Sequence, residues 1–440
     1  MSAYLTILEE KLADSLTAPL PQFTPRRVYG AIGLDGKVTA VVGMRRAGKT
    51  TFLHQLRQQE QAAGAQREQV PYINFEDERL EGLTADQLSP LVESYYRQFP
   101  EFRRHQRVLW CLDEIQNVPG WERFVRRLLD SEQMRLFITG SSATMLSSEI
   151  ATALRGRAWQ VVMHPFSFEE VLVHRGYALP PRPDFLDAPD RSALERHFMD
   201  YLTVGGFPEA QGLDQATRYQ LLRDYVDVAM LRDVVERHNV SNVAGLRWLV
   251  RHLMGNAAGL FSVEKFFGAI KSQGLAISKD TVHQLIGYLQ ECFLVRTVWM
   301  AAASERQRMV NPRKSYPVDP GLIPVFDRSG RANIGHALET AVLVELERRR
   351  AEVLYVKTTE GYEVDFLAQY PSGEHELIQV CADAAAPDTA QRELRALEAA
   401  GRQLPAARKL LLTLTHSGLP KEAPPDVVAQ PAYLWMLTAS

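Results

Sequence analysis

One stretch near the N-terminus of the 440-residue chain has the residue types and spacing of a phosphate-binding loop. Residues 43–50 read Gly-Met-Arg-Arg-Ala-Gly-Lys-Thr, a full match to G-x-x-x-x-G-K-[ST]. The two glycines free the backbone to aim successive N–H groups at phosphate oxygens, and the helix that follows adds the positive end of its dipole. The pattern therefore predicts an ATP site. Its candidate contacts are Gly43, Arg46, Gly48, Lys49, Thr50 and Thr51.

Two residues of this loop and two acids elsewhere could complete the chemistry of ATP hydrolysis. We expect Lys49 to reach the β- and γ-phosphates and the Thr50 hydroxyl to ligate Mg²⁺. Asp113 and Glu114 end the apolar segment 108–112. Asp113 would hold Mg²⁺, directly or through water, and Glu114 would orient and polarise the attacking water. An apolar run that ends in two acids often only marks a strand leaving the core, but after a complete P-loop it predicts hydrolysis.

The elements that must position these residues alternate between strands and helices. Apolar segments at 38–42, 70–75, 108–112 and 136–139 are candidate strands, with helical patterns between them. The first of them runs directly into the phosphate-binding loop, as the mechanism requires. This alternation predicts a parallel sheet flanked by helices.

Together these motifs resemble the AAA+ ATPases of the AAA_14 type that carry a C-terminal domain of unknown function, DUF4143. The resemblance rests on the P-loop, on Leu-Asp-Glu-Ile-Gln at 112–116, on Thr-Gly-Ser-Ser at 139–142 and on Leu-Arg-Gly-Arg at 154–157. Further motifs extend it over nearly the whole chain, namely Pro-Phe-Ser-Phe-Glu-Glu at 165–170, Gly-Gly-Phe-Pro-Glu at 205–209, Tyr-Pro-Val-Asp-Pro-Gly at 316–321 and Glu-Val-Asp-Phe at 363–366.

The resemblance implies an α/β fold of four parts. Residues 1–175 are expected to form an AAA+ P-loop domain with a parallel sheet, and residues 176–245 a helical lid. Residues 246–325 are expected to form a winged-helix domain, and residues 326–440 an α/β nuclease-like domain, the DUF4143 part.

The resemblance also implies roles for polar residues near the nucleotide. Ser141 or Ser142, after the strand at 136–139, would sit between the Mg²⁺ acids and the γ-phosphate, although serines at a strand end usually belong to a turn. Arg155 and Arg157 follow the next helix, where an arginine finger would meet a neighbouring subunit's nucleotide, and Arg157 is the better candidate. Both could equally be surface arginines at a helix end, stabilised by its dipole.

The Gly-Gly-Phe-Pro sequence at 205–208 resembles the lid element of the related STAND-type ATPases, in which a proline closes over the nucleotide. Pro208 is therefore a candidate nucleotide contact. By itself, Gly-Gly-x-Pro predicts only a sharp turn.

Residues 261–298 have the pattern of a winged helix. A helix over 263–271, a turn at Gly274 and a recognition helix over 278–291, N-capped by Ser278, would be followed by a small β-wing. The segment 296–316 contains five basic residues and one acidic residue. The basic residues are Arg296, Arg306, Arg308, Arg313 and Lys314, and the acid is Glu305. This excess could bind DNA phosphates with salt-sensitive affinity. Alternatively, the winged helix only packs against the motor or binds protein.

The tail resembles a PD-(D/E)xK nuclease, with Glu339 on a helix and Asp365 on a strand. An active enzyme of that fold would carry an acid at position 379 and a lysine at position 381, where this chain has Gln379 and Cys381. An amide is a poor Mg²⁺ ligand, and a thiol supplies no fixed positive charge. The tail is therefore predicted to have lost nuclease chemistry and to bind DNA by shape or to serve in oligomer contacts. A weak metal site at Glu339, Glu363 and Asp365 is the less favoured alternative.

Composition limits the classes of protein that the chain can belong to. The formal net charge of −3 argues against coating nucleic acid by bulk charge, so any such contact must be local. Three widely spaced cysteines, Cys111, Cys292 and Cys381, indicate a reducing compartment. The N-terminus lacks the apolar core of a signal peptide, and no apolar run approaches the ~20 residues that span a bilayer. We therefore expect a cytoplasmic protein with no membrane partner.

The leading hypothesis is an ATP-driven motor that binds and remodels or translocates DNA. By resemblance it would work as a homo-oligomeric ring, a hexamer, with each nucleotide between subunits. Branched recombination or repair intermediates are one version of the substrate, which nothing in the residues selects. The runner-up is a STAND-like ATP-dependent switch that recognises a protein partner. A third hypothesis, an active ATP-dependent nuclease, is disfavoured by Gln379 and Cys381.

Overall fold

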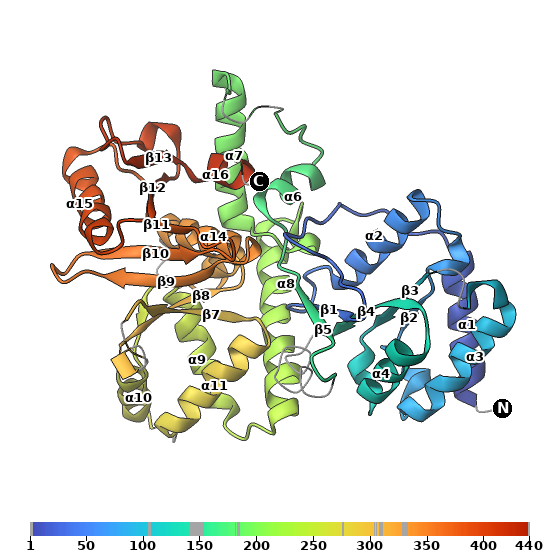
Figure 1. Ribbon diagram of the computed structural model, residues 1–440. Coiled ribbons are helices and arrows are strands. Elements are labelled where there is room, and N and C mark those ends of the chain that lie inside the picture. Colours follow the sequence, from blue (N-terminus) through green and yellow to red (C-terminus); the bar gives the residue numbers. More distant parts are fainter. Residues whose placement is uncertain are drawn as a thin grey trace. The chain divides into compact units, whose positions relative to one another are not determined.

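The computed structural model places the chain in two compact units, Met1–Met163 and His164–Ser440 (Figure 1). It describes residues 3–103, 107–140, 154–180, 182, 185–274, 277–302, 304, 306–307, 311–327 and 333–438. Among these residues, no helix is long and apolar enough to cross a membrane.

The first unit is built on a five-stranded sheet in the order β2-β3-β4-β1-β5, and every neighbouring pair is parallel. The strands are β1 (Val38–Val42), β2 (Tyr72–Asn74), β3 (Val108–Asp113), β4 (Met134–Gly140) and β5 (Ala158–Val162). The parallel sheet expected from the sequence is confirmed. Because the strands are parallel, their carboxyl ends meet at one edge of the sheet, with β4 between β1 and β3.

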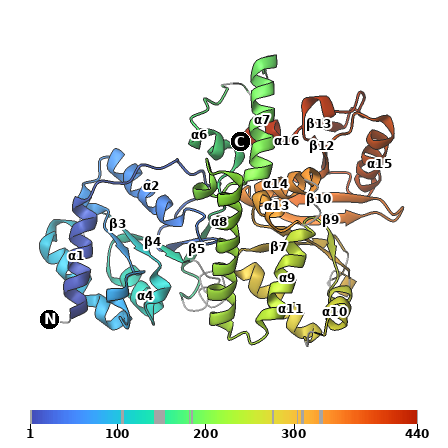
Figure 2. The same ribbon diagram turned by 180° about the vertical axis from the view of Figure 1, so that it is seen from behind.

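Helices cover both faces of this sheet (Figures 1 and 2). They are α1 (Ala3–Thr17), α2 (Lys49–Ala62), α3 (Ser89–Gln98) and α4 (Trp121–Ser131). The chain moves from β1 to the far edge strand β2 and then returns, so right-handed crossovers place α2 on one face and α4 on the other. Phe52, Leu53 and Leu56 anchor α2 in the core beneath it. Burying each such side chain contributes roughly 1.5–3 kcal/mol.

The second unit begins with helices, and its middle part has the order of helices and strands expected for a winged helix. Its first elements are α6 (Phe168–His174), α7 (Ala188–Val204), α8 (Gln215–Val228), a π-helical run at Ala229–Glu236, α9 (Val243–Gly255), β6 (Leu260–Phe261), α10 (Val263–Ser272), α11 (Lys279–Glu291), β7 (Val295–Met300) and β8 (Arg313–Pro317). Ser278 caps α11 as expected, because its hydroxyl accepts the N–H of Thr281 at 3.0 Å. Gly274, with a φ of +76°, makes the predicted turn between α10 and α11.

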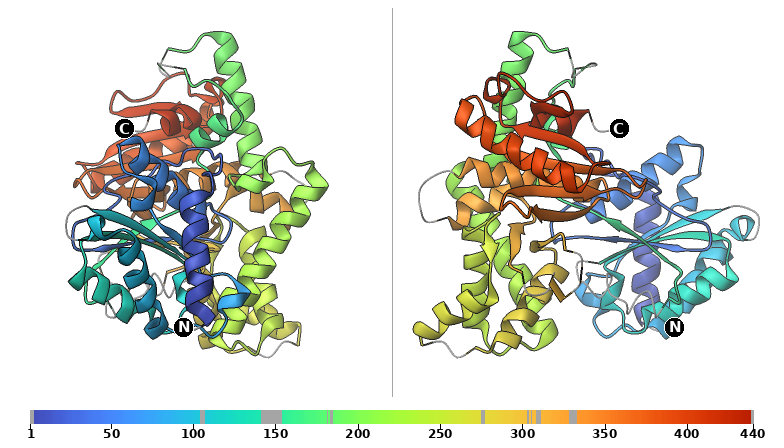
Figure 3. Two further views of the ribbon diagram at one scale, coloured as in Figure 1. Left: turned by 90° about the vertical axis from the view of Figure 1, so that its right-hand side faces the viewer. Right: turned by 60° about the vertical axis from the view of Figure 1, so that its left-hand side comes forward.

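The rest of the second unit continues the wing into a larger sheet (Figure 3). Its elements are α13 (Ile323–Phe326), α14 (Ile334–Arg348), β9 (Glu352–Lys357), β10 (Glu363–Gln369), β11 (His375–Cys381), α15 (Pro387–Gln403), β12 (Arg408–Thr413), β13 (Val427–Pro431) and α16 (Ala432–Leu437). The order is β13-β12-β11-β10-β9-β7-β8-β6. Since β7 pairs directly with β9, one sheet crosses the predicted boundary between the winged helix and the tail.

Side chains of the tail strands alternate between two apolar cores. Leu410 and Leu412 belong to the core that also contains α14, whereas Leu411 belongs to the core under α15. This alternation follows from the two-residue period of a strand, and it places one helix on each face of the sheet. The α14 core also includes Phe168 and Phe198 from α6 and α7, so the helical segment and the tail share one interior.

Candidate nucleotide site

The predicted phosphate-binding loop lies between β1 and α2, in the conformation that its glycines permit. Gly43 has a φ of +148° and Gly48 a φ of +96°, and Gly48 is the residue before α2 begins at Lys49. A Cβ atom on Gly43 would lie 2.1 Å from the carbonyl oxygen of Met163, so no larger residue fits there. Arg46, at a φ of +64°, is a non-glycine residue held in the left-handed region. The loop therefore has the shape that its sequence predicted.

Lys49 lies inside the loop. Its side chain is buried, and Nζ donates to the carbonyl oxygens of Gly43 and Met44, each at 3.1 Å. A buried ammonium needs such acceptors, because desolvation without them is costly. The carbonyl oxygens of the loop thus hold the ammonium of Lys49, and its contact with the terminal phosphates stays a prediction.

Arg26 braces the loop from the segment that precedes β1. Its guanidinium donates to the carbonyl oxygen of Ala47 at 2.6 Å, and its backbone exchanges two hydrogen bonds with the side chain of Gln55 in α2. Sequence reasoning missed this residue. No local pattern marks it, because the contacts span 21 and 29 residues of chain.

Asp113, fully buried at the end of β3, is the centre of the site. Its Oδ2 accepts the hydroxyl of Thr50 at 2.8 Å and that of Tyr72 at 2.7 Å, and its Oδ1 accepts the hydroxyl of Thr139 from β4. Hydrogen bonds to a charged group are each worth about 1.5–3 kcal/mol, which offsets the burial of the carboxylate. Thr50 and Asp113, the two residues predicted to hold Mg²⁺, therefore lie within hydrogen-bonding distance of each other.

The oxygen donors of Thr50 and Asp113 suit a hard cation such as Mg²⁺. Among the residues that the structure describes, no group of three or more His, Cys, Asp or Glu side chains could hold a metal ion alone. A Mg²⁺ ion here would complete its coordination with phosphate oxygens and water, as is usual for this ion. The donor set therefore fits the metal that the sequence predicted.

Tyr72 and Thr139 are site residues that sequence reasoning did not select. Burial, followed by the charge of Asp113, raises the pKa of Tyr72 well above its ordinary value, so its hydroxyl remains a donor. Thr139 accepts the backbone N–H of Glu114 at 2.9 Å while it donates to Asp113. The Thr139 hydroxyl therefore positions both the side chain of Asp113 and the backbone of Glu114.

Glu114 follows Asp113 with a φ of +54°, a left-handed conformation that is strained for a residue with a Cβ. The side-chain amide of Gln116 donates to Oε2 of Glu114. Strain of about 1–3 kcal/mol persists only where the surrounding contacts impose it, and it is commonest at functional sites.

Two family models match the chain. One is described as an AAA domain and matches residues 35–172, which include the P-loop and the acids of β3. The other is described as a domain of unknown function (DUF8612) and matches residues 195–330. The uncharacterized protein MJ1544 of Methanocaldococcus jannaschii is 32% identical over 444 residues, which cover 98% of this chain and 95% of that protein. The chain belongs to the family of MJ1544.

Similar solved structures are more distant. The Walker-type ATPase PABY2304 of Pyrococcus abyssi is 14% identical, with 73% of this chain and 94% of that chain covered and a TM-score of 0.38. The Orc1 protein of Aeropyrum pernix, solved in complex with DNA, is 16% identical, with 74% and 91% covered and a TM-score of 0.27. At these TM-scores neither structure bears on the function of this chain.

Ser141, Ser142 and Arg157 are also predicted to act on the nucleotide. Ser141 and Ser142 lie outside the described residues, so their role stays a prediction. The guanidinium of Arg157 pairs with Asp130 at the end of α4, and both side chains are exposed. An exposed ion pair contributes only about 0–1 kcal/mol to stability, so Arg157 can leave Asp130 at little cost in free energy.

The Gly-Gly turn before Pro208 has a packing role within the second unit. The carboxylate of Asp319 accepts the N–H of Gly206 at 2.7 Å and that of Gly321 at 2.9 Å. A Cβ atom on Gly205 would lie 1.8 Å from Asp319, which explains the glycine there. A nucleotide contact for Pro208 stays a prediction.

The acids of the tail converge on a lysine. Lys314 of β8 is buried, and its Nζ lies 3.1 Å from Glu339, 3.0 Å from Glu363 and 2.8 Å from Asp365. The hydroxyl of Tyr316 also donates to Glu339, at 2.6 Å. Burial alone would lower the pKa of Lys314, but the carboxylates of Asp365, Glu339 and Glu363 reverse this and raise it.

Lys314 therefore does not belong to a free basic surface, contrary to the expectation for residues 296–316. Arg296 is also engaged, by Glu347 at 2.8 Å, and Arg313 lies over the ring of Trp299. Arg308 and Glu305 lie outside the described residues.

Proposed function

We propose that this protein hydrolyses ATP at the loop 43–50 and uses the cycle to remodel or translocate DNA as an oligomer. The observation that carries the ATPase part is the arrangement around Asp113. Thr50 from the P-loop, Thr139 from the intervening strand and the backbone of Glu114 meet within hydrogen-bonding distance of one another or of that carboxylate.

Each residue of this arrangement has a step in hydrolysis. The N–H groups of the loop and the ammonium of Lys49 hold the phosphates. Thr50 and Asp113 would hold Mg²⁺, which when bound neutralises charge on the phosphate oxygens. Glu114, positioned by Thr139 and Gln116, orients the attacking water and accepts its proton.

The DNA part of the proposal is supported by the winged helix. The N-terminal half of α11 is its exposed end, where Lys279, His283 and Gln284 are open to solvent. In helix-turn-helix proteins it is this end of the recognition helix that contacts base edges. Tyr288 is already engaged, because its ring stacks on His238 with centroids 3.6 Å apart.

Oligomerisation is supported by the availability of Arg157 on the surface of the AAA domain. We propose that the protein forms a hexameric ring in which Arg157 completes the nucleotide site of the neighbouring subunit. Arg157→Ala should assemble normally and hydrolyse little ATP. Full activity from this variant would return Arg157 to a surface role.

The tail is proposed to be a nuclease-like module without nuclease chemistry. The ammonium of Lys314 lies among the acids, where a catalytic metal ion would have to bind, and Gln379 is hydrogen-bonded to Glu393 and to the backbone of Asp365. The wild-type protein should not cut DNA in the presence of Mg²⁺. Cutting that Asp365→Ala abolishes would contradict this part of the proposal.

The decisive experiment measures ATP turnover alone and with single-stranded, duplex or four-way-junction DNA. The proposal predicts DNA-stimulated turnover, with affinity that falls steeply as salt rises. Turnover that is slow and indifferent to every DNA would favour an ATP-dependent switch that recognises a protein partner. No turnover from the purified chain under any condition would overturn the ATPase assignment itself.

A further inference from the structure

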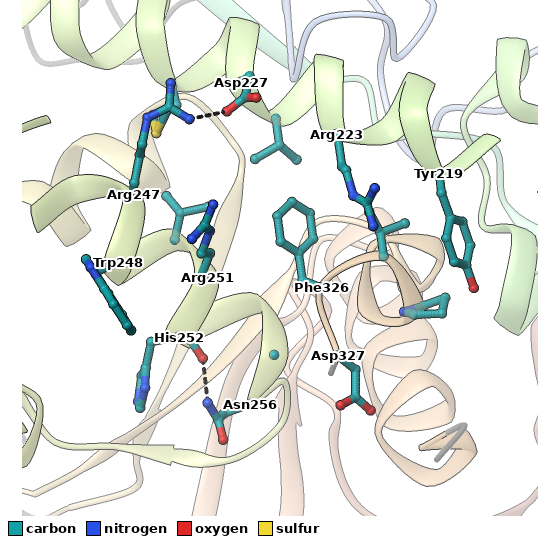
Figure 4. Close-up of a pocket in the computed structure, with 16 residues that line it drawn as sticks. Tyr219, Arg223, Asp227, Arg247, Trp248, Arg251, His252, Asn256, Phe326 and Asp327 are labelled. Carbon is teal, nitrogen blue, oxygen red and sulfur yellow. Dashed lines mark hydrogen bonds and ion pairs between the residues drawn. The ribbon is translucent and has the colours of Figure 1, made fainter. Parts of the chain in front are cut away.

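The second unit has a large open pocket that is lined by no residue of the recognition helix α11. It has a volume of about 830 Å³, within the range of about 300–1,000 Å³ that is usual for ligand pockets. Its walls are α8 with the start of the π-helical run, α9, and the short helix α13. We call it the arginine pocket, because Arg223, Arg247 and Arg251 line it (Figure 4).

Helical spacing explains why the two long walls carry arginines that face one pocket. Tyr219 and Arg223 are four residues apart on α8, and Arg247 and Arg251 are four residues apart on α9. Residues at this spacing lie on the same face of a helix. Below them, Val226, Met230 and Val250 are buried and form an apolar floor.

The charge of the pocket is only partly compensated. Arg247 pairs with Asp227 across the pocket at 3.0 Å. Arg223 and Arg251 are exposed, and within the part of the chain that the structure describes neither makes an ion pair or a side-chain hydrogen bond. Two guanidinium groups on opposite walls are thus available to an anionic ligand.

Aromatic rings alternate with these guanidinium groups. In the view of Figure 4 the side chains follow one another across the pocket in the order Trp248, Arg251, Phe326, Arg223 and Tyr219. Trp248 is 47% exposed, which is unusual for so large an apolar side chain. Acidic side chains of a peptide could pair with the arginines, but they carry no ring to stack on the aromatic side chains.

We infer that the arginine pocket binds a segment of single-stranded nucleic acid, whose bases stack on its rings and whose phosphates pair with Arg223 and Arg251. Interleaved cations and aromatic faces are the features that such binding uses, because every base has a face to stack and every nucleotide a phosphate. A duplex keeps its bases stacked on one another and cannot offer them. The inference extends the proposed DNA contact to a second site, distinct from the exposed end of α11.

The test is the affinity of the full-length protein for a fluorescein-labelled oligothymidylate, measured by anisotropy without ATP at several salt concentrations. Arg223→Gln combined with Arg251→Gln should weaken binding. It should also reduce the slope of log affinity against log salt by about 1.4, because each lost phosphate contact on a single strand accounts for about 0.7. Trp248→Ala should weaken binding by about ten-fold, the effect of losing one stacked base.

Arg232→Gln is the matched control, because Arg232 is an exposed arginine on the π-helical run that does not line the pocket. It should leave both the affinity and the salt slope unchanged. Unchanged binding in the double arginine variant, or the same loss in the control, would overturn the inference. So would competition by polyglutamate as strong as that by unlabelled oligothymidylate, which would assign the pocket to an acidic peptide.

The outcome is separable from that of the proposed function. The binding experiment contains no ATP, so an inactive ATPase would not change it. Conversely, duplex-stimulated ATP turnover that persists in the double arginine variant would leave the motor proposal standing whatever the pocket binds.

Discussion

Two regions of the molecule hold buried acids, and they surround them with different partners. In the AAA domain, hydroxyl groups donate to Asp113, and Lys49 donates to the carbonyl oxygens of Gly43 and Met44 in the loop. In the second unit, Lys314 lies against Glu339, Glu363 and Asp365 themselves. Neutral donors leave a carboxylate able to bind a metal ion, whereas a buried ammonium occupies the place of the metal ion. We therefore call the nucleotide site around Asp113 the open site, and the cluster of Lys314, Glu339, Glu363 and Asp365 the closed site. The contrast teaches that the groups around a buried carboxylate indicate whether it can bind a metal ion, and that the carboxylate alone does not.

The largest expected effect tests the open site. Glu114→Gln should retain ATP and lower its turnover by roughly 10²–10⁴-fold, because the amide cannot accept the proton of the attacking water. Turnover and nucleotide retention are measured on the same preparation. Glu122→Gln, in the first turn of α4, is the control and should behave as wild type. Normal hydrolysis by Glu114→Gln would remove it from the mechanism.

The next effect tests the closed site. Lys314→Met should lower the free energy of unfolding by about 3–5 kcal/mol, because it leaves buried carboxylates without a cation. Urea denaturation measures this. Lys279→Met breaks an exposed pair with Glu264 and should cost less than about 1 kcal/mol. Equal losses in the two variants would show that Lys314 is not the counter-ion of a buried cluster.

A smaller effect is expected at the P-loop lysine. Lys49→Ala should weaken ATP binding by roughly ten- to hundred-fold, the value of one or two hydrogen bonds to a charged group. Fluorescence titration with a labelled ATP analogue measures the dissociation constant. Lys37→Ala, just before β1, should bind as tightly as wild type. Tight binding by Lys49→Ala would place the phosphates elsewhere.

The smallest effect is a pH dependence from the closed site. Burial, followed by the charge of Asp365, raises the pKa of Glu339 from 4.5 to about 7, while Lys314 and Tyr316 oppose the shift. The folded chain then retains a proton that the unfolded chain releases. The resulting stability is complete below about pH 4.5 and is lost as pH rises through about 7.

Glu339→Gln should therefore flatten the fall in thermal stability across this window. Asp319, whose pKa burial raises to about 6, contributes in the same direction, so a residual slope is expected. An exposed control, Glu360→Gln, should leave the profile as it is in wild type. An unchanged profile in Glu339→Gln would show that this carboxyl titrates normally.

What the sequence could predict was determined by local pattern. The P-loop, the acids after β3 and the Ser278 cap each lie within a few residues of the feature that defines them, and the structure contains all three. The role of Lys314 could not be predicted in this way. The sequence groups it with its basic neighbours, but the fold brings it beside Glu339 of α14 and Asp365 of β10, which are 25 and 51 positions away.

Local sequence pattern also could not predict the residues that support the nucleotide site. Tyr72 and Thr139 reach Asp113 because β2 and β4 are its neighbours in the sheet, an order that the sequence does not state. Arg26 approaches the loop from a segment with no regular structure. Threonine, tyrosine and arginine are common residues, so these three cannot be identified as site residues unless the fold is known.

The pairing of β7 with β9 has a consequence for how this protein can be divided. Cutting the chain between β8 and β9 would separate the winged helix from the tail and expose an unpaired strand edge on each piece. Such edges recruit other strands, so both fragments should aggregate when they are produced alone. A rearrangement that split the chain at this point would meet the same obstacle.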